Sequence, residues 1–384
     1  MGLLSAPSLS GVMNVSSSQQ NMGQGLTDRT FLVGHSDGLP INDPYQVASM
    51  SEAFAVLNVD STSPLARTLL ETYHGGCRDI WLVATAPMSE YEPDPTLRDN
   101  AYYAAHKARL DITYAILQNW DLVQTLVLIE APFYNAHGID FATQLANHCE
   151  SSFQTTGSIR IGLIGVRTGY GLSTIDIDAI ASDPRIGTFG PGGKYIMAIA
   201  GEGVYNFTEM STSYMGSAIG SIAAMIAATD LRSSLVYKSL PGMLTLNGSL
   251  TNASLSKLAE SQINPIALTT RGVRGKQYEV VVMTDNTLAD AGSDFWSIGQ
   301  TRLVMKVMEG LVTLGHRYMG TIGYIQFRKD CEDFMRNLEI NRYLKSSTIN
   351  VYKESGNNPN VYVEVTLTPY IDLRQISFTA TIGP

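Results

Sequence analysis

The chain has 384 residues, enough for two or three domains with hydrophobic cores of ordinary size. Its 26 Lys and Arg against 35 Asp and Glu give a net charge of −9, which disfavours nucleic acid or an anionic membrane as a partner. Charged residues make up only 16% of the chain, below the roughly 25% of a typical globular protein. Such a composition suits a protein that buries much of its surface against partners, since interface cores are depleted in charge.

Residues 1–28 are rich in Ser, Gln, Asn and Gly and contain only scattered apolar side chains. Such a segment buries too little apolar surface to order by itself, so we expect an N-terminal arm that is disordered or ordered on another surface. It lacks the basic and apolar regions of a signal peptide, and the longest apolar run, residues 215–228, is too short to span a bilayer. Cys77, Cys149 and Cys331 lie far apart, which disfavours a disulfide framework and indicates a reducing compartment.

From Thr30 onward, apolar runs alternate with helical patterns. The apolar runs predict strands at residues 30–34, 80–84, 125–129, 159–166 and 194–200. Helical spacing predicts helices at residues 51–57, 64–74, 101–120, 141–153 and 214–228. Within residues 101–120 one apolar face contains Ala104, Ala108, Ile112, Ala115 and Ile116. Strands that are apolar on both faces are typical of a covered parallel sheet, so residues 29–264 are predicted to form an α/β sandwich with a mostly parallel sheet.

The pattern changes near residue 265, and we expect a separate C-terminal α+β lobe over residues 265–370. A strand is predicted at residues 278–283 and helices at 297–318 and 330–345. Two strands with alternating polar and apolar residues close the chain, and such period-two patterning is typical of half-buried strands. Their apolar positions are Val361, Val363, Val365 and Leu367, and then Ile376, Phe378, Ala380 and Ile382. Residues 371–384 are interpreted as a C-terminal strand arm.

The predicted last strand, residues 375–382, has no charge. An exposed edge strand of this kind promotes aggregation unless it pairs with another strand. Residues 11–15 have enough β-forming side chains to add a strand as well. Both ends therefore suit strand addition between copies of the chain, in which backbone hydrogen bonds supply affinity. The residues expected in these inter-subunit strands are Val12, Val15, Val361, Val363, Val365, Ile376, Phe378 and Ile382. The residues are equally compatible with a terminal strand that completes its own sheet.

Motifs for catalysis or cofactor binding are absent. The Gly-rich stretch at residues 187–194 lacks the Walker spacing and leads into a strand, which favours an ordinary turn. No G-x-S-x-G elbow occurs, and no G-x-G-x-x-G follows a strand. The six histidines lack metal-ligand spacing, and Asp176 and Asp178 lack the rest of an EF-hand loop. We therefore expect no catalytic, cofactor-binding or metal-binding residues, no cofactor and no enzyme activity.

Two alternatives stay open on the residues alone. One is an α/β hydrolase or dehydrogenase whose site is assembled from scattered His and Asp residues, which would require a deep pocket with perturbed titratable groups. The other is a capsid-like or tube-forming shell protein of another fold, which would lack the alternating strands and helices.

Several segments together resemble the tail sheath proteins of contractile bacteriophages and of related contractile injection systems. They are Phe31-Leu32-Val33-Gly34, the loop with Pro40 and Pro44, residues 47–54, Ser63-Pro64-Leu65 through Gly75-Gly76 to Trp81-Leu82-Val83, residues 228–230 and 236–242, Ile263-Asn264-Pro265-Ile266, the long helix around Arg302, the helix from Asp330 and the two terminal strands. The order and spacing of these segments carry the resemblance from about Thr30 onward. The stretch from Pro87 to Asn100 is too short for the large insertion of many members, and the residues around Tyr237 and Gly242 depart from the family pattern.

The resemblance implies a non-enzymatic subunit of a cylinder of stacked six-fold rings around a tail tube. Baseplate and tail terminator proteins would be further partners, and contraction would drive the tube through the host envelope for genome ejection. Each N- and C-terminal arm would add a strand to a neighbouring C-terminal lobe. The implied location is the virion tail, after assembly in the host cytoplasm.

Overall fold

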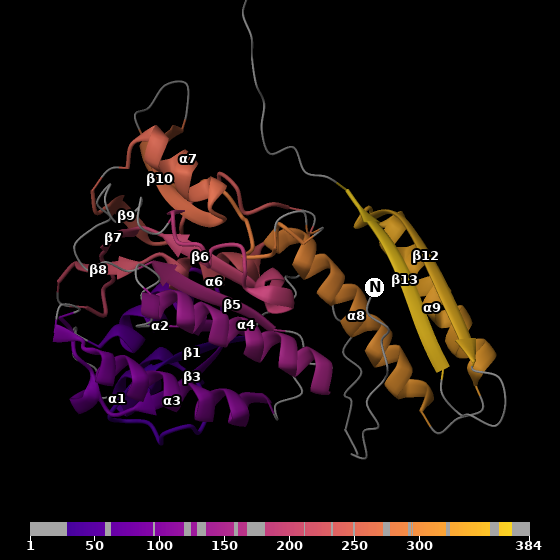
Figure 1. Ribbon diagram of the computed structural model, residues 1–384, viewed down its shortest axis with the longest axis horizontal. Helices are drawn as coiled ribbons and strands as arrows, with labels where there is room; N and C mark the ends of the chain where they lie inside the picture. The colour runs from indigo at the N-terminus through magenta and orange to yellow at the C-terminus, as the bar shows by residue number, and fades with distance from the viewer. Residues whose placement is uncertain are drawn as a thin grey trace, which may run out of the picture.

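The computed structural model describes residues 29–370 except for short internal segments. The segments left out are 58–62, 95–96, 119–123, 129–135, 157–159, 167–180, 211, 232, 249, 272–276, 291–292, 294, 320–322 and 354–360. Helices and mixed sheets alternate along this part of the chain, so the expected α/β class is confirmed (Figure 1).

The main sheet has eight strands among the described residues, in the order β11-β10-β6-β5-β4-β1-β3-β2. Their bounds are β1 (Arg29–His35), β2 (Tyr45–Gln46), β3 (Asp79–Ala86), β4 (Gln124–Leu128), β5 (Arg160–Val166), β6 (Ile196–Ala200), β10 (Ile263–Arg271) and β11 (Gln277–Val282). The inner neighbours pair in parallel from β3 to β10, whereas β2 and β11 pair antiparallel at the two edges. The register places Leu32 of β1 level with Leu82 of β3 and Val127 of β4.

Helices cover both faces of the main sheet. They are α2 (Pro64–His74), α3 (Asn100–Gln118), α4 (Ala136–Thr156) and α6 (Ile219–Ala228). A Cβ at Gly162 would meet Leu145 of α4, whereas a Cβ at Gly165 would meet Ile219 of α6. Because these glycines are three positions apart in β5, α4 and α6 lie on opposite faces. α2 packs against α6 and α3 packs against α4, so each pair forms one layer.

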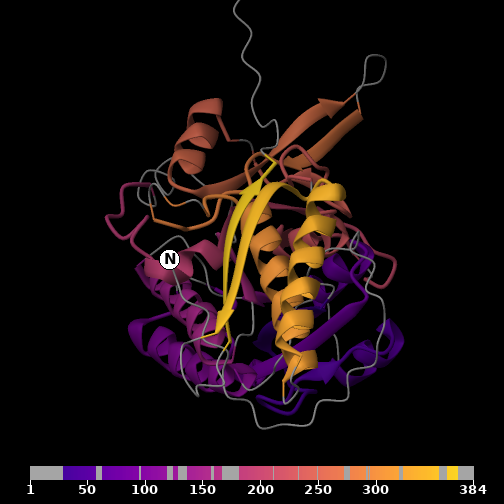
Figure 2. The same cartoon turned by 90° about the vertical axis from the view of Figure 1, so that its right-hand side faces the viewer.

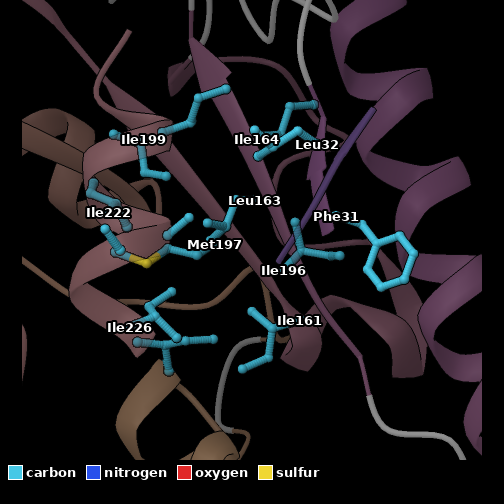
Figure 3. Packing of buried hydrophobic residues seen from close by; sticks show 14 of the residues in the cluster. Phe31, Leu32, Ile161, Leu163, Ile164, Ile196, Met197, Ile199, Ile222 and Ile226 are labelled. Atoms are coloured by element: carbon cyan, nitrogen blue, oxygen red, sulfur yellow. The ribbon is translucent and has the colours of Figure 1, made fainter. Parts of the chain in front are cut away.

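The core lies between these layers. Figure 3 shows Ile222 and Ile226 of α6 near Ile199 and Met197 of β6 and Leu163 of β5. All five side chains are at most 1% exposed. Helix α2 begins sharply because Ser63 accepts a hydrogen bond from the backbone of Ala66 and Pro64 occupies its first turn. The apolar runs of the sequence thus become strands because both their faces are buried.

Smaller elements surround the sheet. They are α1 (Met50–Leu57), the short 3-10 helices η1 (Met88–Glu90) and η3 (Gly190–Tyr195), α7 (Asn252–Glu260), and an antiparallel sheet of β7 (Glu202–Tyr205), β8 (Tyr214–Ser217) and β9 (Met243–Leu246) in the order β8-β7-β9. The sequence predicted one helix over residues 214–228, which is wrong for the first four residues. They form β8, because short apolar runs with Gly and Ser fit a strand as well as a helix.

The last elements form what we call the hairpin lobe, made of α8 (Ile298–Tyr318), α9 (Tyr324–Ile340), β12 (Leu344–Lys353) and β13 (Val361–Pro369). Figure 2 shows the hairpin beside the two helices. The helix predicted at residues 330–345 instead begins at Tyr324 and ends at Ile340, where Arg342 turns the chain with a φ of 59°. The strand predicted at residues 278–283 exists as β11, but it lies in the main sheet and not with the hairpin lobe.

Candidate subunit interface

The hairpin of β12 and β13 has one apolar and one polar face. Cross-strand partners Ile349 and Val365, and Val351 and Val363, belong to the face that packs against the core. The opposite face carries Ser346, Thr348, Asn350 and Tyr352 of β12 and Tyr362, Glu364, Thr366 and Thr368 of β13. Because successive side chains of a strand alternate between faces, this pattern fixes the register of the hairpin.

Specific contacts hold the hairpin on its helices. The Tyr324 hydroxyl at the start of α9 donates a hydrogen bond to the carbonyl of Val351 at 2.9 Å. The Ser347 hydroxyl donates to Glu339 of α9 at 2.7 Å. On the polar face, Tyr352 donates to Glu364 across the hairpin at 2.9 Å. The hairpin is therefore fixed on one side by helices, and its other face remains polar.

Both outer edges of this hairpin lack a strand partner among the described residues, since the sheet has only two strands there. A two-stranded sheet is marginal in water, and an open edge presents unpaired backbone groups. Val361, Val363 and Val365 lie in β13, are half-buried, and stand opposite Lys353, Val351 and Ile349 of β12 in the same chain. Val12, Val15, Ile376, Phe378 and Ile382, and both arms, lie outside the described residues.

A buried polar joint connects the hairpin lobe to the rest of the chain. Arg302 of α8 is fully buried and donates to the carbonyls of Ile226 and Thr229, at the end of α6, at 2.8 and 2.7 Å. Asp285, also fully buried, accepts from the hydroxyl of Ser234 at 2.7 Å. Burial lowers the pKa of Arg302 to about 10, opposed by the charges of Asp230 and Asp285. A cation at the carbonyl end of a helix is stabilising, so this contact fixes α8 against α6.

The Gly-rich stretch at residues 187–194 has a packing role. Gly192 and Gly193 are buried in η3, where any Cβ would overlap the backbone of Ala146 in α4 and of Leu288. At the turn predicted from the sequence, the backbone of η3 thus lies against the backbones of α4 and of the segment at Leu288. The side chain of Lys194 forms an ion pair with Glu150 of α4, with 3.4 Å between Nζ and the carboxylate.

Several titratable groups with shifted pKa lie together around α4: Tyr114, His148, Cys149 and Tyr195, with the rings of Tyr114 and His148 stacked. His148 of α4 accepts a hydrogen bond at Nε2 from Arg160 at 2.9 Å, and burial, reinforced by the Arg160 charge, lowers its pKa well below the usual value. Burial raises the pKa of Cys149, beside it, and of Cys331 in α9 to about 12. The described part of the chain contains no group of three or more His, Cys, Asp or Glu side chains that could hold a metal ion.

Asp176 and Asp178 fall outside the described residues. None of the helices described there is both long and apolar enough to cross a membrane. Sequence reasoning missed β12 and the buried joint at Arg302. The sequence pointed to Arg302 only because its helix is one of the segments whose order resembles the sheath proteins. Its burial was not predictable, because a charged residue in a helix is most often exposed.

Comparison with solved structures identifies the fold. The chain is similar to the anti-feeding prophage helical sheath in its contracted state, with a TM-score of 0.59, 13% identity and coverage of 98% of this chain and 99% of that one. A chain of the contracted anti-feeding prophage baseplate gives a TM-score of 0.67 at 13% identity, covering 99% of both chains. The sheath tail protein of Desulfitobacterium hafniense gives 0.56 at 10% identity, covering 94% of this chain and all of that one.

No family model and no curated protein sequence matches the chain. The structural matches nevertheless cover nearly its whole length, and they include the sheath of a further extracellular contractile injection system. The chain has the contractile tail sheath fold, as the sequence resemblance led us to expect.

Proposed function

We propose that the chain is the structural, non-enzymatic subunit of a contractile tail sheath. The observation that carries this proposal is a sheath fold that ends in a two-stranded hairpin with both edges open among the described residues. In this proposal, the N-terminal arm (1–28) and the C-terminal arm (371–384) of neighbouring copies add strands to those edges. Seven or eight backbone pairings at about 0.5–1.5 kcal/mol net each, together with the apolar area that the strand buries, would offset the entropy lost on ordering the arm.

The copies would stack as six-fold rings around a tail tube, with baseplate and tail terminator proteins at the two ends. The α/β sandwich with its mostly parallel sheet (29–264) would move as a rigid body, together with the C-terminal lobe (265–370), while the arms act as hinges. Contraction would release free energy as the bodies pack more closely, and it would drive the tube through the host envelope. The particle would be a virion tail or an injection machine assembled in the host cytoplasm.

Removing the C-terminal arm tests this function. We expect purified chain lacking residues 375–384 to form no tubes by electron microscopy, whereas the full chain forms them. Thr379→Pro removes one backbone donor from the proposed strand and should shorten or abolish the tubes. Thr379→Ala keeps that donor and is the matched control. Tubes of normal yield and length from the truncated chain would rule out strand addition by this arm.

A further inference from the structure

Helix α3 has an apolar face that no other described part of the chain covers. Ala104, Ala108, Ile112 and Ala115 of the apolar face predicted from the sequence lie on it, whereas Ile116 of that prediction is half-buried. The exposed side chains of this face recur mostly at intervals of three or four residues. They are Ala101, Ala104, Ala105, Ala108, Ile112 and Ala115, all exposed. Ile112 alone is 55% exposed, and Ile41, from the loop beside α3, is 52% exposed. At 1.5 Å per residue this face is about 21 Å long.

Helix α9 has an exposed face of nearly the same length, about 22 Å. Ile325 and Ile340 lie at its two ends and are 81% and 67% exposed. Lys329, Asp333 and Arg336 lie between them and are also exposed. Two isoleucines this far apart form no apolar patch, so the charges between them decide which surface this face fits.

The charges on the two faces are complementary. On α3, Lys107 and Asp111 flank the apolar face and are exposed. When the helices are laid antiparallel with Ile325 over Ala115, the equal rise per residue brings Lys329 level with Asp111. The same register brings Asp333 level with Lys107. None of these four charged side chains forms an ion pair within the described residues.

The two faces lie far apart in one molecule, α3 at the indigo-violet end and α9 at the yellow end (Figure 1). We propose that α9 of one copy docks antiparallel on α3 of a second copy. A pair of identical α9 faces is disfavoured, because antiparallel pairing about the centre of the stripe would place Lys329 opposite Arg336. Residues 298–370 carry nine Lys and Arg against seven Asp and Glu, a net +2, so the rest of the chain carries −11. This asymmetry also favours contact between unlike ends.

Such a contact is heterologous, and repetition of a heterologous contact builds closed rings or open helical arrays. The α3–α9 contact uses residues of neither arm. It therefore adds a contact between rigid bodies to the strand addition proposed above, and it can be tested separately from that strand addition.

Cross-linking tests the contact directly. The chain with Ala115→Cys and Ile325→Cys should give a ladder of linked oligomers under mild oxidation, because the three native cysteines are buried. Ile325→Cys combined with Leu244→Cys is the control, since Leu244 is 59% exposed but lies in β9. A ladder from the control pair alone, or from neither pair in preparations that form tubes, would overturn the contact without affecting the sheath function.

A charge exchange gives a second, independent test. Lys329→Asp and Asp111→Lys should each lower the yield of linked or assembled oligomers by about tenfold, since each places like charges opposite each other. The double variant should recover most of the yield, because it restores an opposite pair. Circular dichroism checks that each variant is folded. Equal loss in the double variant and in the folded single variants would contradict the proposed register.

Discussion

Gly192 and Gly315 differ in what surrounds them, and this difference gives a prediction. A Cβ at Gly192 would overlap the backbone carbonyl of Ala146, whereas a Cβ at Gly315, inside α8, meets nothing within 4 Å. We expect Gly192→Ala to lower the free energy of unfolding by about 1–3 kcal/mol, because the backbone of α4 must move. Gly315→Ala should raise it by about 0.5–1 kcal/mol, because alanine favours the helix. Urea denaturation of both variants measures the two values, and a stabilising Gly192→Ala would contradict the packing described.

His148 gives a second prediction at this scale. Its pKa is lowered in the folded state, so below about pH 6.5 the unfolded chain binds a proton that the folded chain does not. The free energy of unfolding should therefore fall by about 1.4 kcal/mol per pH unit from this group as the pH drops from about 6.5 toward its folded pKa. His148→Gln keeps an acceptor for Arg160 and should remove this part of the slope.

Chemical denaturation between pH 5 and pH 8 measures that slope. His316→Gln is the control, because His316 is exposed in the last turn of α8. An unchanged slope in His148→Gln would show that the proton is bound elsewhere.

At the scale of the elements, the two hydrogen bonds of Arg302 join α8 to the end of α6, and we expect the stability of the chain to depend on them. Arg302→Met removes the donor to the carbonyls of Ile226 and Thr229 and leaves Asp285 buried without the nearby cation. We expect a loss of about 3 kcal/mol in the free energy of unfolding, because two buried carbonyls lose their donor and a buried carboxylate loses a nearby positive charge. Lys306→Met, which removes an ion pair with Glu309 within α8, should cost no more than about 1 kcal/mol. Similar losses in the two variants would contradict a special role for the joint.

Some elements of the fold were predictable from the sequence and others were not. Strands β1, β5 and β6 were predictable because their apolar runs are continuous, and burial on both faces requires such runs. Strand β12 was not, because Lys345, Ser346 and Ser347 interrupt its alternation and helix α9 precedes it closely. Of the apolar face predicted for α3, the alanines and Ile112 are exposed and Ile116 is half-buried, because sequence cannot tell whether such a face meets the core or a partner. The open hairpin edges follow from tertiary pairing and leave no local pattern.

At the scale of the whole molecule, the hairpin lobe should be less protected than the main sheet until copies assemble. β12 and β13 pair only with each other among the described residues, whereas β5 has strands on both sides and helices on both faces. Local opening of a two-stranded hairpin needs less free energy than opening of a central strand. In the isolated chain we expect the amides of β12 and β13 to exchange with solvent deuterium at least about a hundredfold faster than those of β5.

Assembly should reverse this difference if strands of neighbouring copies cover the hairpin edges, because each added strand must open before β12 or β13 can. Hydrogen exchange of tubes and of isolated chain, compared peptide by peptide, measures the change, with β5 and β6 as internal reference. The chain lacking residues 375–384 should keep the fast exchange of the hairpin at every concentration. Protection of β13 that equals that of β5 in the isolated chain would mean that its edge is already covered, and a neighbouring strand would then have no open edge to join.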